Sequence, residues 1–375
     1  MREWQQTSKL RTRMVKQFQI YVVQALQLTR HWFQYGLSLI RGKVFLFLLG
    51  VSLSLAIVAC SAVKSNVKLA LVSFSINQAV YEQIIPKFVE KWNKEHHQNV
   101  SFTQSYSGSG SQTEAVIKGL QADVVHLALG IDANKIEQAG LIKPDWELRA
   151  PLGGVMTRSV VALVTRPGNP KGIKTWSDLA NNDLSVVTAN PKTSGGGRWN
   201  FLGLWGSVIA KGGDQKQAIE FMTKVYQNVS VLPENARAAS DLFFHKGQGD
   251  VLINYESEVI RALQNGEKLS YVVPDINISI DSPIIVMDKN VDQRGTREIA
   301  EAFVNYLYTP VAQREFASLG YRPVNPYLAT EMASKYPEVP IIFNAEYLGG
   351  WDKIQKQFFA DGAVFDKIQN GNKKT

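Results

Sequence analysis

Apolar residues along the chain form short uninterrupted runs that alternate with amphipathic segments. The run at 69–74 (LALVSF) is typical of a buried strand, and residues 81–92 place apolar side chains at the spacing of an amphipathic helix. A strand at 100–104, a Gly/Ser loop, a helix from about Ser111 and a buried strand at 123–129 follow. Strands that alternate with helices predict a mostly parallel sheet with helices on both faces.

The same alternation continues through the rest of the chain. The pattern predicts further strands at 160–165, 185–188, 251–254, 270–273 and 284–287, and helices at 198–209, 218–227, 297–306 and 311–318. No internal repeat, low-complexity tract or long linker interrupts it. We therefore expect a compact α/β protein of two lobes.

The N-terminal region has the pattern of an export signal. Arg41 and Lys43 precede an uncharged stretch, 44–58, which ends at Ala59 and Cys60. About 15 apolar residues fit a signal peptide better than a membrane-spanning helix, which needs roughly 20. The ending IVAC resembles a bacterial lipoprotein box, so we expect cleavage before Cys60 and lipidation of its thiol. The alternative is a small buried cysteine in an uncleaved anchor.

Composition supports this division of the chain. The whole sequence carries 41 basic and 33 acidic residues, but residues 1–59 hold eight of the basic ones and a single acid, which leaves 33 and 32 for the remainder. Seven of the eight net positive charges therefore belong to the leader, and the net charge does not indicate nucleic-acid binding. Cys60 is the only cysteine, which excludes an intramolecular disulfide and a cysteine metal site. Residues 1–40 stay open between a long cytoplasmic region, an amphipathic segment and an overlong reading frame, the last of which we favour.

Two Gly/Ser-rich segments follow predicted strands and precede predicted helices, at 105–112 (SYSGSGSQ) and 190–200 (NPKTSGGGRWN). The start of a helix presents unpartnered N–H groups and the positive end of its dipole, which together favour an anion. Glycine lets the backbone approach a ligand closely, and ligands of open α/β sheets bind beyond the carboxyl ends of strands. Neither segment has the Gly-Lys-Ser/Thr ending of an ATP-binding phosphate loop. The segments therefore favour binding of an anion.

Signals for catalysis are weak. The five histidines lack metal-ligand spacing, and no Gly-x-Ser-x-Gly sequence is present. Asp250, Glu256 and Glu258 offer carboxylates for acid–base chemistry, but a structural role is the better interpretation for the two glutamates. We predict no catalytic residue, no metal and no cofactor. An exported α/β transferase with a phosphorylated substrate stays as an alternative.

The motifs around these loops resemble the periplasmic sulfate- and thiosulfate-binding proteins of ABC importers. The resemblance covers about residues 66–370 and is carried by the segments 105–125, 166–173, 190–200 and 249–258. It implies a periplasmic-binding-protein type II fold whose two lobes close over one dehydrated oxyanion. The protein is expected to be a monomer that lies outside the inner membrane and delivers the anion to a membrane permease. The expected organisation is a leader at 1–59, a tether at 60–68, lobe 1 at 66–157 and 277–375, and lobe 2 at 158–276.

The resemblance also implies the ligand-binding residues. It implies five backbone N–H donors and two hydroxyl donors. The backbone donors are Ser75, Ser109, Gly195, Gly196 and Ala236, and the hydroxyl donors are Ser194 and Tyr255. Arg198 and Arg237 flank the site, and we expect them to orient the loop peptides rather than contact the anion.

This chain departs from the family pattern at three positions. Ser75 replaces an aspartate, Ser111 replaces a lysine, and Tyr255 stands where sulfate-binding members have tryptophan. The sequence around Tyr255 leans towards the thiosulfate-binding branch, so the choice between the two anions stays open. A receptor for phosphate is the alternative within this class, although a site made of donors disfavours an anion that carries an O–H.

Overall fold

The computed structural model describes residues 66–372, which belong to one compact unit. The predicted leader and the predicted lipidation at Cys60 lie outside the described residues. Within the described part, no helix combines the length and the apolar character that crossing a membrane requires.

The first lobe is built on a five-stranded sheet in the order β2-β1-β3-β10-β4. Its strands are β1 (Val67–Phe74), β2 (Val100–Ser107), β3 (Val124–His126), β4 (Val155–Ser159) and β10 (Ile280–Val286). β1 pairs in parallel with β2 and β3, whereas β10 runs antiparallel to β3 and β4. Four of its five strands therefore run in the same direction, with β10 reversed, although parallel and antiparallel pairs are equal in number.

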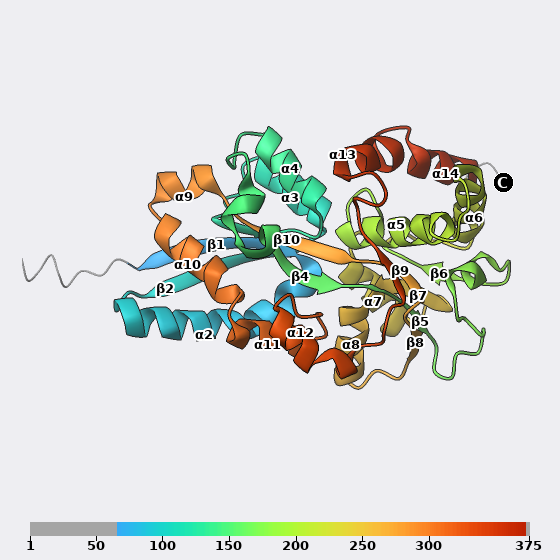
Figure 1. The fold of residues 1–375 in the computed structure, drawn as a ribbon, viewed down its shortest axis with the longest axis horizontal. Coiled ribbons are helices and arrows are strands. Elements are labelled where there is room, and N and C mark those ends of the chain that lie inside the picture. The colour runs from blue at the N-terminus through green and yellow to red at the C-terminus, as the bar shows by residue number, and fades with distance from the viewer. Residues whose placement is uncertain (1–65, 373–375) are drawn as a thin grey trace, which may run out of the picture. The chain divides into compact units, whose positions relative to one another are not determined.

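Helices cover both faces of this sheet because side chains alternate between faces along each strand (Figure 1). Val72, Val125 and Ile285 pack with the apolar side chains of α3 and α4, while Leu71 and Ile284 belong to the core cluster that also contains residues of α2, α10 and α11. The helices of this lobe are α2 (Gln78–His96), α3 (Ser109–Ile117), α4 (Gly130–Gln138), α9 (Asp288–Arg294), α10 (Arg297–Leu307), α11 (Pro310–Ser318) and α12 (Pro326–Glu331), with the short 3₁₀ helices η1 (Ser75–Asn77), η2 (Trp146–Arg149), η3 (Pro151–Gly154) and η5 (Ala333–Lys335).

The second lobe has a four-stranded sheet in the order β6-β7-β5-β8. Its strands are β5 (Val161–Thr165), β6 (Val186–Val187), β7 (Val251–Tyr255) and β8 (Ser270–Val272), and β5 is antiparallel to both of its neighbours. The helices are α5 (Gly195–Ile209), α6 (Gln215–Gln227), α7 (Ala236–Phe244), α8 (Glu256–Gln264) and the 3₁₀ helix η4 (Trp176–Ala180). A two-stranded sheet pairs β9 (Ile276–Ile278) with β11 (Ile341–Phe343).

The chain passes between the two main sheets at Val160, which separates β4 from β5, and again at Ser279, just before β10. Both passages are extended strand-to-strand connections, so the lobes share continuous backbone. The C-terminal elements α13 (Trp351–Ile354), η6 (Gln355–Phe359) and α14 (Val364–Asn372) follow β11.

Two of these C-terminal elements, η6 and α14, pack on the second lobe. The ring of Phe201 in α5 lies 5.6 Å from that of Phe358, 5.4 Å from that of Phe359 and 6.0 Å from that of Phe365. The expected limits assign residues 277–375 to lobe 1, and those limits stay a prediction.

The structure confirms the predicted two-lobed α/β fold, and the strand predicted at 123–129 is shorter than expected. β3 ends at His126, and the amide of Leu127 donates to the carbonyl of Pro283 before the chain turns into α4. Ala128 and Leu129 are nonetheless fully buried. They are apolar because the second lobe covers them, which a strand pattern alone does not distinguish from burial inside a sheet.

Candidate anion-binding site

Three helices and η1 begin at the boundary between the lobes. η1 and α3 directly follow the carboxyl ends of β1 and β2, and α5 follows the loop after β6. α7 begins after Asn235, whose side chain accepts a hydrogen bond from the amide of Ala238 at 2.9 Å. Each start leaves first-turn amides without a partner inside its own helix.

The contacts of the two glycines at the start of α5 bring these helix starts together. A methyl group at Gly195 would overlap Cβ of Ala128 and lie 3.1 Å from Cβ of Ser109, in the first lobe. A methyl group at Gly196 would lie 3.1 Å from Cβ of Ala236 and 2.8 Å from Cε2 of Tyr255, in the second lobe. The two glycines therefore occupy a position that only a residue without a side chain can fill.

Ser75 joins the same group of residues. Its hydroxyl donates to Oδ1 of Asn235 at 3.2 Å, which places η1 beside the start of α7. The ring of Phe74 lies 6.2 Å from that of Tyr255. The predicted ligand residues thus come together although they are distributed over nearly 200 positions of sequence. The structure places all seven of them at this boundary: Ser75, Ser109, Ser194, Gly195, Gly196, Ala236 and Tyr255.

The amides at the start of α5 fall into two groups. Gly197 donates its N–H to Oγ of Ser194 at 3.2 Å, and Arg198 donates to the carbonyl of Ser194 at 3.1 Å. No acceptor among residues 66–372 takes the amides of Gly195 and Gly196. These two donors are available to a ligand, although both glycines are buried in the closed structure.

The two serines differ in what they can offer. The hydroxyl of Ser109 donates to Oδ2 of Asp132 at 2.7 Å and accepts from the amide of Ala128 at 2.9 Å, so only its backbone N–H is free to bind an anion. The hydroxyl of Ser194 accepts from Gly197 and keeps its own hydrogen for a ligand. Ser109 can therefore offer its backbone N–H and Ser194 its hydroxyl, and their roles as ligands stay a prediction.

Tyr255 carries a polar atom that the described protein does not satisfy. The residue is 2% exposed, and its hydroxyl has no hydrogen-bond partner among residues 66–372. Burial raises the pKa of Tyr255 well above its usual value of 10, so the hydroxyl stays protonated and can donate. A buried donor without a partner costs about 1–3 kcal/mol, and a ligand at this position would remove that cost.

The flanking arginines are used within the protein. Nε of Arg198 donates to the carbonyl of Pro191 at 2.9 Å, and its Nη1 lies 2.6 Å from Oδ1 of Asp132. Nη2 of Arg237 lies 2.8 Å from Oε1 of Glu258. These contacts support an orienting role for Arg198, whereas the buried Nε of Arg237 has no partner among residues 66–372 and stays available to donate to an anion.

Hydrogen bonds also cross between the lobes around the site. The amide of Gly110 donates to the carbonyl of Thr193 at 3.1 Å, Ser107 donates to Oε1 of Glu234 at 3.0 Å, and Nε1 of Trp199 donates to the carbonyl of Ala128 at 2.8 Å. The lobes are therefore closed on each other in this structure.

Sequence reasoning did not identify Asp132, Ala128 or Asn235 as part of this site. Asp132 has 0% exposure and connects Ser109 of the first lobe with Arg198 of the second. Nothing in its neighbourhood in the sequence indicates that partnership. The N-cap role of Asn235 could have been predicted from the sequence, because asparagine before an apolar helix is a typical N-cap.

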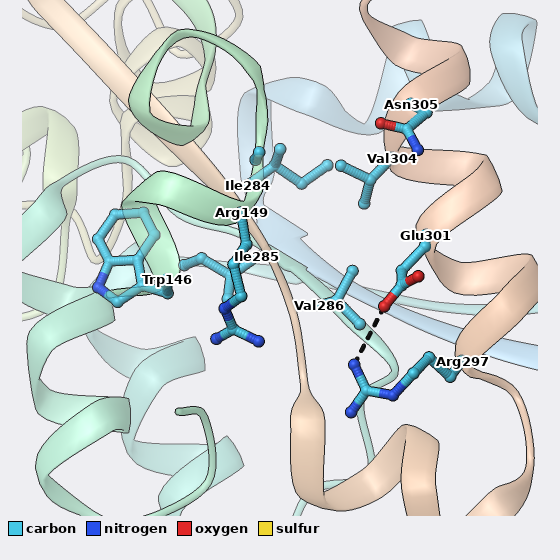
Figure 2. A pocket seen from close by; sticks show the side chains of 10 residues that line it. Trp146, Arg149, Ile284, Ile285, Val286, Arg297, Glu301, Val304 and Asn305 are labelled. Carbon is cyan, nitrogen blue, oxygen red and sulfur yellow. Dashed lines mark hydrogen bonds and ion pairs between the residues drawn. The ribbon is translucent and has the colours of Figure 1, made fainter. Parts of the chain in front are cut away.

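A separate cavity of about 110 Å³ lies in the first lobe, against β10, η2 and α10 (Figure 2). Arg149 and Arg297 both donate to Oδ1 of Asp288, at 2.7 Å and 3.0 Å, and Arg297 also pairs with Glu301 at 3.1 Å. None of the predicted ligand residues lines it. Its charged groups satisfy one another.

Comparison with known proteins agrees with the fold and with the motifs. The chain belongs to the family of bacterial extracellular solute-binding proteins, whose profile matches residues 71–322. The matched family consists of bacterial extracellular proteins that bind solutes.

Individual relatives make the similarity more specific. A sulfate-binding protein of Synechococcus elongatus is 54% identical over 304 residues, which cover 81% of this chain and 87% of the relative. A thiosulfate-binding protein of Pseudomonas aeruginosa is 35% identical and covers 80% of this chain and 92% of its own length. The solved structure of the sulfate-binding protein SubI from Mycobacterium tuberculosis superimposes with a TM-score of 0.73 at 31% identity, over 78% of this chain and all of SubI. These similarities confirm the predicted family and fold class.

Proposed function

We propose that this protein is an extracytoplasmic receptor that binds sulfate or thiosulfate between its lobes and delivers the anion to an ABC permease. The proposal rests on the buried hydroxyl of Tyr255, which has no hydrogen-bond partner among residues 66–372. It lies beside Gly196, and the amides of Gly195 and Gly196 also lack an acceptor in this part of the chain. The names of the similar proteins, which bind sulfate or thiosulfate, support the same anion class.

Neutral donors are sufficient for a dianion. The proposed site offers five backbone amides and two hydroxyls, and a hydrogen bond to a charged group contributes about 1.5–3 kcal/mol. Several such bonds together exceed the roughly 8 kcal/mol that micromolar affinity requires and leave a margin for desolvation of the anion. The helix starts add favourable dipoles at the same place.

The carboxylates around the site are already occupied. Asp132 accepts from Ser109 and Arg198, and Glu258 accepts from Ser240 at 2.9 Å and from Arg237. The two buried carboxylates beside the site thus already accept hydrogen bonds from the protein on both of their oxygens. Sulfate and thiosulfate are fully deprotonated at neutral pH, whereas monohydrogen phosphate carries an O–H that needs an acceptor. We expect strong discrimination against phosphate, because an unpaired buried polar group is costly.

Delivery follows from closure of the lobes. Donors come from η1 and α3 in one lobe and from α5, α7 and Tyr255 in the other, so the anion makes its full set of bonds only when the lobes are closed. A permease that recognises the closed form would then receive loaded protein.

We propose that residues 1–59 direct export and that Cys60 carries the lipid that holds the protein at the membrane. One lipidated cysteine anchors a folded domain without a spanning helix, with about 0.8 kcal/mol per buried CH₂ group. Metabolic labelling with a fatty acid tests this part: the unaltered chain should become labelled and Cys60→Ala should not. Labelling of both proteins, or of neither, would remove the anchor from the proposal.

Titration calorimetry tests the receptor function. The chain from Ser61 onward, stripped of bound anion, is titrated separately with sulfate, thiosulfate and phosphate. Micromolar binding of sulfate or thiosulfate with phosphate inert is the expected result, and the tighter of the two names the anion. Absence of binding by both sulfur anions would refute the proposal, and a preference for phosphate would replace it with a phosphate receptor.

A further inference from the structure

The segment 319–322 contacts both lobes next to the turns that carry the proposed ligand residues Ser75 and Tyr255. It follows α11, and the amide of Arg322 donates to the carbonyl of Arg158 in β4 at 2.8 Å, which ties the segment to the first lobe. We call residues 319–322 the interlobe strap.

One side of the strap reaches η1. The hydroxyl of Tyr321 donates to Oδ1 of Asn77 at 2.5 Å, and Nδ2 of Asn77 donates to Oγ of Ser73 at 3.0 Å. Tyr321 is 3% exposed, and Asn77 and Ser73 are fully buried. Asn77 ends η1, two residues after Ser75, so this chain of hydrogen bonds fixes the turn that presents the amide of Ser75.

The other side of the strap reaches the start of α8. Nε and Nη2 of Arg322 donate to the two carboxylate oxygens of Glu256 at 2.7 Å and 2.9 Å. Glu256 is fully buried and directly follows Tyr255, and its amide donates to the carbonyl of Val160 at 2.9 Å. A two-point contact of this kind fixes orientation as well as distance. It therefore holds the turn that aims the Tyr255 ring at Gly196.

The strap has little freedom to move. Gly320 adopts φ +91°, and a methyl group there would lie 2.7 Å from Cβ of Ile260 and 3.0 Å from Cα of Ser257 in α8. The hydroxyl of Tyr336 donates to the carbonyl of Tyr321 at 2.6 Å, and Nη2 of Arg322 also donates to the carbonyl of Pro337 at 2.9 Å. Hydrogen bonds with Tyr336 and Pro337 thus restrict the positions of Tyr321 and Arg322.

We infer that Tyr321 and Arg322 are positioning residues of the anion site, each holding a ligand-bearing turn of a different lobe. Neither touches the proposed ligand residues through a hydrogen bond; they act through Asn77 and Glu256. The strap thereby couples the geometry of one lobe's donors to that of the other. This inference rests on the proposed function, because it assigns the strap a role in that same site.

Affinity and dissociation rate for sulfate and thiosulfate test the strap, measured on the full chain in a mild detergent well below its unfolding temperature. We expect Tyr321→Phe to weaken binding about fivefold and Arg322→Lys about tenfold, because each loses an oriented bond to a buried partner. The loss should appear mainly in faster dissociation. If the strap acts as one unit, the double variant should weaken binding by clearly less than the product of about fiftyfold.

Matched controls separate positioning from general stability. Arg314→Lys alters another two-point arginine–glutamate pair, with Glu331 at 2.6 Å and 2.9 Å, and Tyr308→Phe alters another tyrosine of the first lobe. Both should leave the anion affinity within about twofold. A role in stability alone predicts lower unfolding temperatures for the strap variants with unchanged affinity and dissociation rate.

The outcomes distinguish the two proposals. Failure of the unaltered chain to bind either sulfur anion overturns the receptor function and the inference with it. Normal binding by the unaltered chain together with unchanged affinity in both strap variants overturns the inference alone. Weaker, faster-dissociating binding in the strap variants, with the controls unaffected, supports it.

Discussion

At the interlobe site the amides of Gly195 and Gly196 and the hydroxyl of Tyr255 have no partner among residues 66–372, although all are neutral groups that are easy to satisfy. In the cavity beside α10 the opposite holds. There Arg149 and Arg297, which line the cavity, both donate to the neighbouring carboxylate of Asp288, so these charges compensate one another. Paired charges therefore do not mark the proposed anion site. Neutral donors without partners that converge from several helix starts mark it, because a single unpaired hydroxyl, such as that of Tyr226 in α6, also occurs away from it.

A side chain at Gly195, beside the unpaired amides, is expected to have the largest effect on anion binding. Gly195→Val should weaken anion binding by more than about a hundredfold, because its side chain would overlap Ala128 and keep the lobes from closing on the ligand. Calorimetry on folded protein checks the loss. Gly371→Val is the matched control, since a side chain at that exposed helical glycine meets nothing within 4 Å. Equal affinity in both variants would show that the site lies elsewhere.

The second prediction concerns the hydroxyl of Ser194. Ser194→Ala removes a donor to the anion and should weaken binding about thirtyfold, a value within the range for hydrogen bonds to charged groups. It also removes the N-cap of α5 and should lower stability by about 1 kcal/mol. Thr309→Ala removes the N-cap of α11 and provides the control. If both variants lose stability but neither loses affinity, Ser194 is a cap and not a ligand.

The third prediction uses two buried tyrosine hydroxyls that both lack partners. Tyr255→Phe should weaken binding about tenfold, whereas Tyr226→Phe, in α6 and away from the site, should leave it unchanged. Both variants should unfold at the same or a higher temperature without ligand, because each loses an unpaired buried hydroxyl. Calorimetry and thermal unfolding measure the two effects. Similar affinities in both variants would remove the Tyr255 hydroxyl from the ligand shell.

The smallest effect on binding is expected for a substitution beside the α10 cavity, outside the proposed anion site. Asp288→Asn should leave the anion affinity within about twofold, because the cavity beside α10 contains no proposed ligand residue. It should lower stability at neutral pH. Burial raises the pKa of Asp288, but hydrogen bonds from Arg149, the amide of Lys143 and Arg297 outweigh this and hold it at about 2.

The sign of the pH dependence follows from that lowered pKa. The carboxylate of Asp288 contributes stability above its unfolded pKa of about 4, and this contribution is lost as the pH falls through about 2. The unfolding temperatures of the unaltered chain and of Asp288→Asn should therefore converge between pH 4 and pH 2. A constant difference across that range would show that the variant acts through packing and not through charge.

Much of the fold was predictable because buried positions recur with one period along a strand and with another along a helix. The runs at 69–74 and 251–254 lie within β1 and β7, and the predicted helices at 81–92 and 297–306 lie within α2 and α10. The limits of β3 were wrong because Ala128 and Leu129 are buried by the opposite lobe. Burial by a distant part of the chain has no local period.

The glycine- and serine-rich loops, and with them the expectation of an anion site at helix starts, came from the sequence alone, since helix-end geometry depends on neighbours in the chain. The tertiary structure alone decided which of those starts meet. It placed Gly196 against Tyr255, paired Asp132 with Arg198 across the lobes, and put the strap behind both ligand-bearing turns. Those partners are separated by about 60 to 240 residues, and no local pattern encodes a contact that forms only when two lobes close.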